Sequence, residues 1–436
     1  MDPDSEQKAE GSFLLRAGNL AAGTFNANVE DKERKVAFAV ICSSIFLSGF
    51  LYTFLIPLVP SYHLIEGAFF STAEVALLFA SFSFGAAMGT PLTLFLAGHV
   101  KCWMMIATAQ VVFFFNCVMF MAGSSFPILF LSRTIGGVGA TFLHSGSIAM
   151  LETLFPASER GNRFVIVYFC GGFGLTMGPL IGGSLSSDGA FWPCLLAALV
   201  LAGLFAATMM FLKDNDSEFT KMEPLMPHVK DPQTMLSLTS LVLVSATVAF
   251  SEVILPLHLD VAFNTSASAL GGLMMIAAIA YIFVANVAAL VSEKINRNVL
   301  MGGGLAANGV AFFALFSPES LAVEVVPVML LGCSASVVYT GCFLRLVDSV
   351  GQGDARSPAL QQLSFVAHNV GAFLGPALLG ASVHMFGLEA AAYGYGFIAV
   401  CAGAAIGWYA KKTASLDDEP SINASALVDF QLLFTL

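Results

Sequence analysis

Apolar stretches of about 20 residues recur along the chain, separated by short polar segments. A helix of about 20 apolar residues crosses the hydrocarbon core of a bilayer, which is about 30 Å thick. Twelve stretches meet this condition, at residues 36–58, 73–96, 102–122, 127–150, 164–186, 190–212, 235–257, 268–291, 298–316, 321–344, 361–384 and 390–410. We therefore predict an all-α membrane protein with twelve transmembrane helices.

The basic residues outside these stretches fall on one side of the predicted membrane. They precede the first helix, follow the last, or lie in or beside the loops that lead from an even-numbered helix to an odd-numbered one. Because Lys and Arg are retained in short cytoplasmic loops, this distribution predicts two cytoplasmic termini and an even number of spans. Of the 18 basic residues, Arg133 alone lies within a stretch.

The longest polar segment inside the chain separates six predicted helices from six. This segment, residues 213–234, has the acidic and proline-containing composition of a linker. We expect two six-helix bundles, residues 36–212 and 235–410, joined by a cytoplasmic linker. Residues 1–35 and 411–436 are then cytoplasmic tails.

A repeated motif relates the two halves. Its members in the fifth helix recur in the eleventh at an offset of 197 residues: Gly174, Gly178, Pro179 and Gly183 correspond to Gly371, Gly375, Pro376 and Gly380, and Gly182 lies within the first copy. Residues 56–58 likewise resemble residues 255–257, at an offset of 199. These offsets indicate duplication of a six-helix unit, a design in which two bundles rock around a central site and give alternating access.

Composition supports the membrane assignment and narrows the function. Hydrophobic residues make up 57% and charged residues 11% of the 436 residues, too little polar surface for a soluble globule. Much of the net charge of −11 lies in the tails and polar loops, so we expect no nucleic-acid partner. The sequence contains no zinc-site or ATP-binding motif, so we expect no enzyme activity, metal or cofactor, and a proton gradient as the energy source.

Two charged residues inside predicted helices are candidates for a functional site. Glu252 in the seventh and Arg133 in the fourth both sit roughly 8–10 Å below the outer interface. A charge at mid-bilayer costs about 2.5–3.5 kcal/mol on insertion scales, so each needs a partner or a task. Either they form an ion pair that closes an outer gate and breaks when Glu252 is protonated, or the pair is static and Arg133 only braces contacts between helices.

Other polar residues in the helices form a second group of candidates for proton or substrate handling: His368, Asn369, Asn286, Tyr281, His144 and Thr53. Thr53 belongs to it because the repeat offset places it opposite Glu252. A histidine in an apolar helix is more often a packing residue, so both readings stay open for His368 and His144.

The chain resembles the major facilitator superfamily. The resemblance rests on residues 132–140 in the fourth helix, on the motif Glu159-Arg160-Gly161 after it, and on the Gly-Pro pattern of the fifth helix. Within the superfamily the chain is most similar to proton-coupled drug antiporters and vesicular amine transporters, through residues 56–62, 230–232 and 281–286. The resemblance spans residues 36–410 and implies antiport, with which the Gly-Pro motif is associated.

The chain also departs from these families. Where the vesicular amine transporters have carboxylates in helices 1, 10 and 11, this chain has Ser48, Ser336 and Phe365. Only Glu252 remains, so monoamine transport is not implied. The loop at residues 97–101 lacks the acidic residue that the superfamily usually has there.

We therefore expect a proton-coupled antiporter of a small organic cation, such as an amine, polyamine or drug, working as a monomer in the bilayer. The alternatives are a facilitative or organic-anion carrier in which Arg133 binds the substrate, and a transport-inactive receptor or scaffold. The acidic dileucine pattern at residues 10–15 favours an endosomal or secretory vesicle membrane, with the plasma membrane as the alternative. The sequon at Asn264 is the predicted glycosylation site.

Overall fold

The protein is seen in a computed structural model that describes residues 32–58, 60, 70–122, 125–186, 189–213, 231–292, 294–316, 320–348 and 358–413. Its long elements are α-helices. They are the first helix (Lys32–Leu58, ending in the 3-10 turn η1, Ile56–Leu58), α2 (Thr72–Leu96), α3 (Cys102–Ala122), α4 (Phe126–Leu154), α5 (Ala157–Ser184), α6 (Phe191–Phe211), α8 (Pro232–Phe263), α9 (Ala267–Val291), α10 (Arg297–Ala314), α11 (Leu321–Asp348), α13 (Pro358–Phe386) and α14 (Leu388–Thr413).

These elements confirm the predicted twelve-helix fold for the described part of the chain. Eleven of them are long and apolar enough to cross a membrane. The other, α10, has 18 residues and packs against α11 and α14. A helix satisfies its own backbone hydrogen bonds, which is the condition for lying in hydrocarbon.

Polar caps set several helix starts at the membrane surfaces. Ser71 and Glu74 form a capping box at the start of α2, with hydrogen bonds of 3.3 Å and 2.8 Å. Asp231 accepts a 2.7 Å bond from the backbone N–H of Thr234 in the first turn of α8. Such caps satisfy N–H groups that have no partner within the helix.

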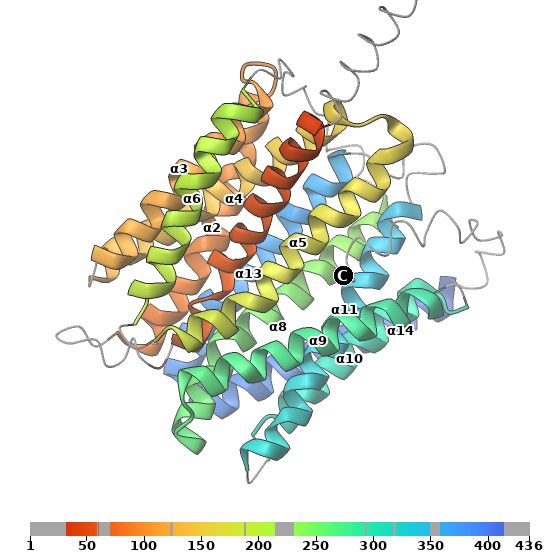
Figure 1. Ribbon diagram of the computed structural model, residues 1–436. Helices are drawn as coiled ribbons and strands as arrows, with labels where there is room; N and C mark the ends of the chain where they lie inside the picture. The colour runs from red at the N-terminus through yellow and green to blue at the C-terminus, as the bar shows by residue number, and fades with distance from the viewer. Residues whose placement is uncertain are drawn as a thin grey trace, which may run out of the picture.

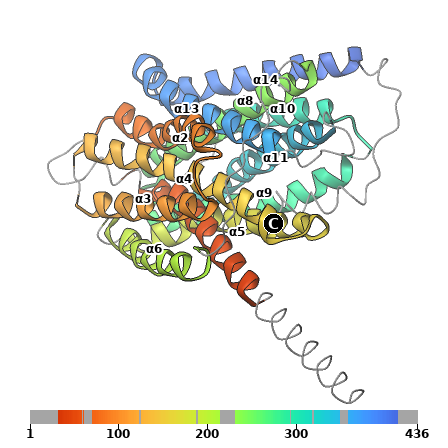
Figure 2. The same ribbon diagram turned by 90° about the horizontal axis from the view of Figure 1, so that it is seen from above.

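The helices form two groups, one from each half of the sequence (Figures 1 and 2). The groups meet along α2 and α13 and along α5 and α9. In Figure 1, α5 and α9 meet where α5 ends and α9 begins, and they diverge toward the other end. We call the side where they meet the outer side, following the predicted topology.

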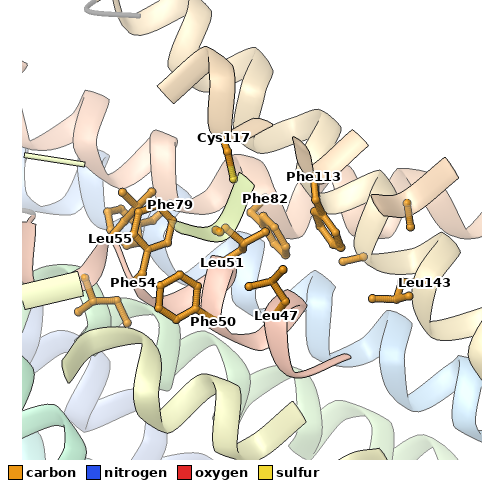
Figure 3. Close-up of a cluster of buried hydrophobic side chains, with 14 of the residues drawn as sticks. Leu47, Phe50, Leu51, Phe54, Leu55, Phe79, Phe82, Phe113, Cys117 and Leu143 are labelled. Carbon is orange, nitrogen blue, oxygen red and sulfur yellow. The ribbon is translucent and has the colours of Figure 1, made fainter. Parts of the chain in front are cut away.

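The first helix forms the centre of the apolar core in the N-terminal half. Its side chains contact those of α2, α3 and α4, as the close-up in Figure 3 shows. Leu51 and Phe54 are fully buried there, as is Phe113 of α3. By contrast, Phe95 and Val261 are 74% and 85% exposed, as expected for side chains that face lipid.

Glycines of α5 let this helix lie directly against the first helix. A Cβ at Gly174 would overlap the carbonyl oxygen of Phe46, and one at Gly182 would overlap that of Phe54. Small residues at such spacing allow two backbones to approach closely. The motif is therefore an interface between helices of one half.

The C-terminal half repeats this arrangement. A Cβ at Gly371 or Gly375 of α13 would overlap the carbonyl oxygens of Val242 or Ala246 in α8. The repeated glycines thus join equivalent helix pairs, the first helix with α5 and α8 with α13. This equivalence supports the pseudo-symmetry inferred from the sequence.

Candidate functional site

Glu252 contacts a residue of the opposite half. It lies on α8, is half-buried, and its Oε2 accepts a 3.2 Å hydrogen bond from the hydroxyl of Tyr52 on the first helix. Pro256, one turn further along α8, interrupts the helical hydrogen bonding near this point. The bond joins the central helices of the two halves through a group that can exchange a proton.

Arg133 holds the end of the first helix in place. Its side chain is buried, and its two terminal nitrogens donate to the carbonyls of Leu51 (2.9 Å) and Tyr52 (3.2 Å). The α-helix stops at Thr53, so carbonyls of its last turn need partners from outside the helix. The guanidinium also lies 4.7 Å from the ring centroid of Phe82, a cation–π distance.

The expected gate between Arg133 and Glu252 therefore has a different form. Tyr52 connects the two residues, because its carbonyl accepts from Arg133 while its hydroxyl donates to Glu252. Arg133 acts here as the residue that orients Tyr52.

A second polar group lies along the same face of α8. Ser245 precedes Glu252 by seven residues, two helical turns or about 10.5 Å. Its Oγ lies 3.0 Å from the hydroxyl of Tyr339 on α11 and 3.1 Å from Nδ1 of His368 on α13. Tyr339 and His368 are also within hydrogen-bond distance, at 3.2 Å, and the ring of Tyr281 on α9 lies 6.2 Å from that of Tyr339. Four helices of the C-terminal half thus contribute to one cluster, which we call the Tyr339 cluster.

Three other predicted site residues donate to backbone carbonyls. Asn286 and Asn369 each donate to the carbonyl one turn earlier in their own helix. Thr53 is buried and donates to the carbonyl of Leu175 on α5 at 2.9 Å, beside Gly178. The expectation that Thr53 faces Glu252 is therefore wrong by one residue, since Tyr52 has that place.

The interface of α13 with the N-terminal half also contains polar residues. The ring of His144 on α4 stacks on that of Phe365 at 4.7 Å. The amide of Gln362 lies 3.4 Å from the hydroxyl of Ser145 on α4 and 3.4 Å from that of Thr90 on α2. His144 thus packs between the halves, outside the Tyr339 cluster.

The outer contact between the halves is made by small residues and backbone. A Cβ at Gly183 would overlap the carbonyl of Ala267, and one at Gly271 would overlap the carbonyl of Pro179. At Gly380, a Cβ would meet the backbone of Ala73 at 2.9 Å. The Gly-Pro motif and its repeat therefore also shape the outer interface.

The remaining predicted motifs lie at helix ends or outside the described residues. Glu159 forms a 3.2 Å ion pair with Arg163 in the first turns of α5, while the surroundings of Arg160 and Gly161 lie outside the described residues. Asn264 is exposed in a three-residue connection between α8 and α9, with a left-handed φ of 48°. The dileucine pattern and most of the linker also lie outside the described residues.

Tyr52, Ser245 and Tyr339 were not among the predicted site residues. Tyr52 could have been found, because it corresponds to Glu252 at an offset of 200, one residue larger than the offset between residues 56–58 and 255–257. Ser245 could have been found from its seven-residue spacing to Glu252, which places both on one helix face. Tyr339 gave no such signal.

Comparison with known proteins identifies relatives of this chain. The profile of the Major Facilitator Superfamily matches residues 41–353. The vesicular acetylcholine transporter of Drosophila melanogaster is 20% identical over 402 residues, covering 82% of this chain and 68% of that protein. The human synaptic vesicular amine transporter is 27% identical over 230 residues, covering 51% of this chain and 44% of that protein.

A solved structure shares the fold. A bacterial homologue of the human lysosomal transporter Spinster, in an inward-facing and unoccupied conformation, superposes with a TM-score of 0.71 at 16% identity. The match covers 89% of this chain and 99% of that one.

Proposed function

Because the chain belongs to the Major Facilitator Superfamily, a family of membrane transporters, we propose that it exchanges protons for a small organic cation by alternating access. The observation that carries this proposal is the hydrogen bond between Tyr52 and Glu252, which joins the two halves at a membrane-embedded carboxylate. A carboxylate in this position can hold a proton or a cation, and the two compete for it. Competition for one site is the simplest basis for antiport.

The surroundings of Glu252 suit an organic cation. Tyr52 provides an aromatic ring beside the carboxylate, and Tyr339 and Tyr281 provide two more around Ser245 on the same face of α8. Aromatic faces attract quaternary and protonated amines, and their hydroxyls offer hydrogen-bond partners. The proposed site therefore extends from Glu252 to the Tyr339 cluster.

The exchange would proceed by rocking of the two halves. In the described state α5 and α9 meet on the outer side, at Gly183 and Gly271, and diverge toward the opposite side, while α13 keeps its contacts with α2 and α4. Protonation of Glu252 weakens its attraction for a cation and alters the bond to Tyr52. Release of the cation and reopening of the outer contact would then be linked.

We also propose the setting in which this exchange works. The termini face the cytoplasm, the protein acts as a monomer without a cofactor, and the proton gradient supplies the energy. The dileucine pattern and the similarity to vesicular transporters favour a vesicle membrane. An acidic lumen would drive uptake of the cation into the vesicle.

The position of Arg133 argues against the organic-anion alternative. Its side chain is 1% exposed and its terminal nitrogens donate to backbone carbonyls, so a substrate anion would have to displace internal bonds. We therefore keep the cation as the proposed substrate.

Transport by the purified protein tests the proposal. The protein is reconstituted in liposomes with an acidic interior, and radiolabelled organic cations and anions are offered outside. We expect accumulation of at least one cation, which collapses when a protonophore dissipates the gradient. Accumulation of anions alone, or uptake that ignores the gradient, would overturn the proposal.

A further inference from the structure

A second buried carboxyl group lies near the outer end of the C-terminal half. Glu324, in the first turn of α11, is 0% exposed, and among the described residues neither of its carboxylate oxygens has a hydrogen-bond partner. Nε2 of His258 on α8 lies 3.8 Å from Oε1 of Glu324. That nitrogen also has no hydrogen-bond partner there.

The backbone carbonyl of Leu315, where α10 ends, interacts with the ring of His258. A neutral imidazole has one N–H donor and one lone pair. With the hydrogen on Nδ1, the lone pair of Nε2 faces Glu324.

This arrangement leaves room for one proton between the two side chains. An ionised carboxylate only accepts hydrogen bonds, so without a proton two acceptors face each other in a buried place, which is unfavourable. One proton, on either the ring or the carboxyl, makes one group a donor to the other. An approach of about 1 Å then gives a normal hydrogen bond.

We propose that His258 and Glu324 form a binding site for one proton that reaches it from the outer compartment and fastens α8 to α11. Access is through His258, whose side chain is 14% exposed and lies five residues before the end of α8. The site is separate from the proposed exchange at Glu252. Because His258 follows Glu252 by six residues, about 9 Å along α8, the bound proton holds the helix that carries Glu252.

The other groups around the pair come from three helices. Glu389, in the first turn of α14, acts on His258 through its charge, and Asp260 lies two residues along α8. From the end of α10, the ring of Phe316 lies 4.4 Å from that of His258, and Tyr393 of α14 contacts Phe316. The charge of Glu389 favours a protonated ring, whereas the aromatic surroundings favour a neutral ring with the proton on Glu324. In either case the pair holds one proton.

The pH dependence of folding tests the site without reference to transport. The midpoint of thermal unfolding is measured for the purified protein in detergent between about pH 5 and pH 8.5. In an unfolded chain His and Glu are both deprotonated above about pH 6.5. A folded pair that keeps its proton is therefore stabilised less as the pH rises, and the wild-type midpoint should fall by several degrees over this range.

Two variants locate that effect. In Glu324→Gln the side-chain amide donates to the lone pair of His258 at every pH. The unfolding midpoint should therefore fall much less with rising pH than in the wild type. His258→Gln provides a permanent donor to Glu324 and should also flatten the profile. Asp260→Asn is the matched control, which removes a carboxylate from the same end of α8 and should keep the wild-type profile.

The result that overturns the site is a wild-type pH profile in either glutamine variant. Because the readout is unfolding, that result would leave the proposed exchange at Glu252 standing. Conversely, failure of cation uptake would leave the proton site standing.

Discussion

The hydroxyl of Tyr52 donates a 3.2 Å hydrogen bond to the carboxylate of Glu252, from the first helix of one half to α8 of the other. Arg133 fixes the backbone of Tyr52 through two carbonyls. A charge buried in the N-terminal half is thereby connected to a titratable group in the C-terminal half. The first three predictions below separate the contributions of these three residues.

Glu252→Gln keeps the shape of the side chain but cannot release a proton. We expect the variant to reach the membrane, to lose accumulation driven by a pH gradient, and to retain exchange of substrate for substrate. Uptake into proteoliposomes, normalised to incorporated protein, measures both activities. Asp260→Asn, a charge loss elsewhere on α8, should behave as wild type. Wild-type coupling in Glu252→Gln would exclude Glu252 as the coupling site.

Tyr52→Phe removes the bond between the halves and keeps the ring. Hydrogen bonds to charged groups contribute about 1.5–3 kcal/mol, so the outward-open population should rise by about 10-fold or more. Nitroxide labels can be placed at Phe191 and Val261, which are both exposed near the outer side. The distance between the labels, measured by electron paramagnetic resonance, reports this opening. Tyr395→Phe, which removes a hydroxyl bonded to Gly375 within one half, should leave the distances unchanged. Equal distance distributions in wild type and Tyr52→Phe would refute the gate.

Arg133→Lys tests whether this residue braces the helix end. A lysine cannot bond both carbonyls in the same fork, and an unsatisfied buried carbonyl costs about 1–3 kcal/mol. We expect a lower midpoint of thermal unfolding. Arg163→Lys, in an exposed i,i+4 pair with Glu159, should change it little. An unchanged midpoint combined with loss of anion uptake would instead support the organic-anion carrier.

The glycines at equivalent positions in the two halves should respond alike to a bulky residue. A leucine at Gly178 or Gly375 must push its helix away from its neighbour, and overpacking costs about 1–3 kcal/mol. We expect transport to fall more than membrane insertion in both variants. Gly203→Leu is the control, because a Cβ there meets nothing within 4 Å. Full transport by either variant would show that the close contact is dispensable.

The cap of α8 gives a pH-dependent prediction. Asp231 is partly buried, which opposes ionisation, but hydrogen bonds from Thr234 and the nearby charge of Arg345 hold the pKa of its carboxyl below its usual value. Its stabilisation is therefore complete above the unfolded pKa and is lost as the pH falls through the folded one. Asp231→Ala should cost about 1 kcal/mol near neutral pH and less in acid. Asp231→Asn keeps a capping oxygen that does not ionise and should remove the pH dependence. Thermal unfolding across acidic pH measures both.

The helices were predictable because each must cross the same thickness of hydrocarbon without unsatisfied backbone groups. The apolar stretch at residues 102–122 matches α3 residue for residue. Differences occur where helices extend past the membrane: α5 begins at Ala157, seven residues before the predicted start, because polar residues continue the helix into the loop that follows α4.

The contacts of the site were less predictable because they depend on how the two halves are placed. Thr53 and Tyr52 differ by one residue, and therefore by about 100° around the helix, which decides whether the side chain faces α5 or Glu252. Arg133 was predicted to face Glu252. Instead it donates to the free carbonyls at the end of the first helix, and sequence spacing does not reveal such partners. Glu324 lies in the first turn of a span, where an acidic residue is normally expected to be exposed at the membrane surface.

The outer contact at Gly183 and Gly271 is made between one helix and the main-chain carbonyls of another. Main-chain atoms are the same in every protein, so this contact demands small residues at a few positions and leaves the neighbouring side chains free to change. Selection on the lining of the substrate site can then proceed without disturbing the parts that move. Relatives named for the transport of acetylcholine and of amines are 20–27% identical to this chain, so most side chains have changed among them.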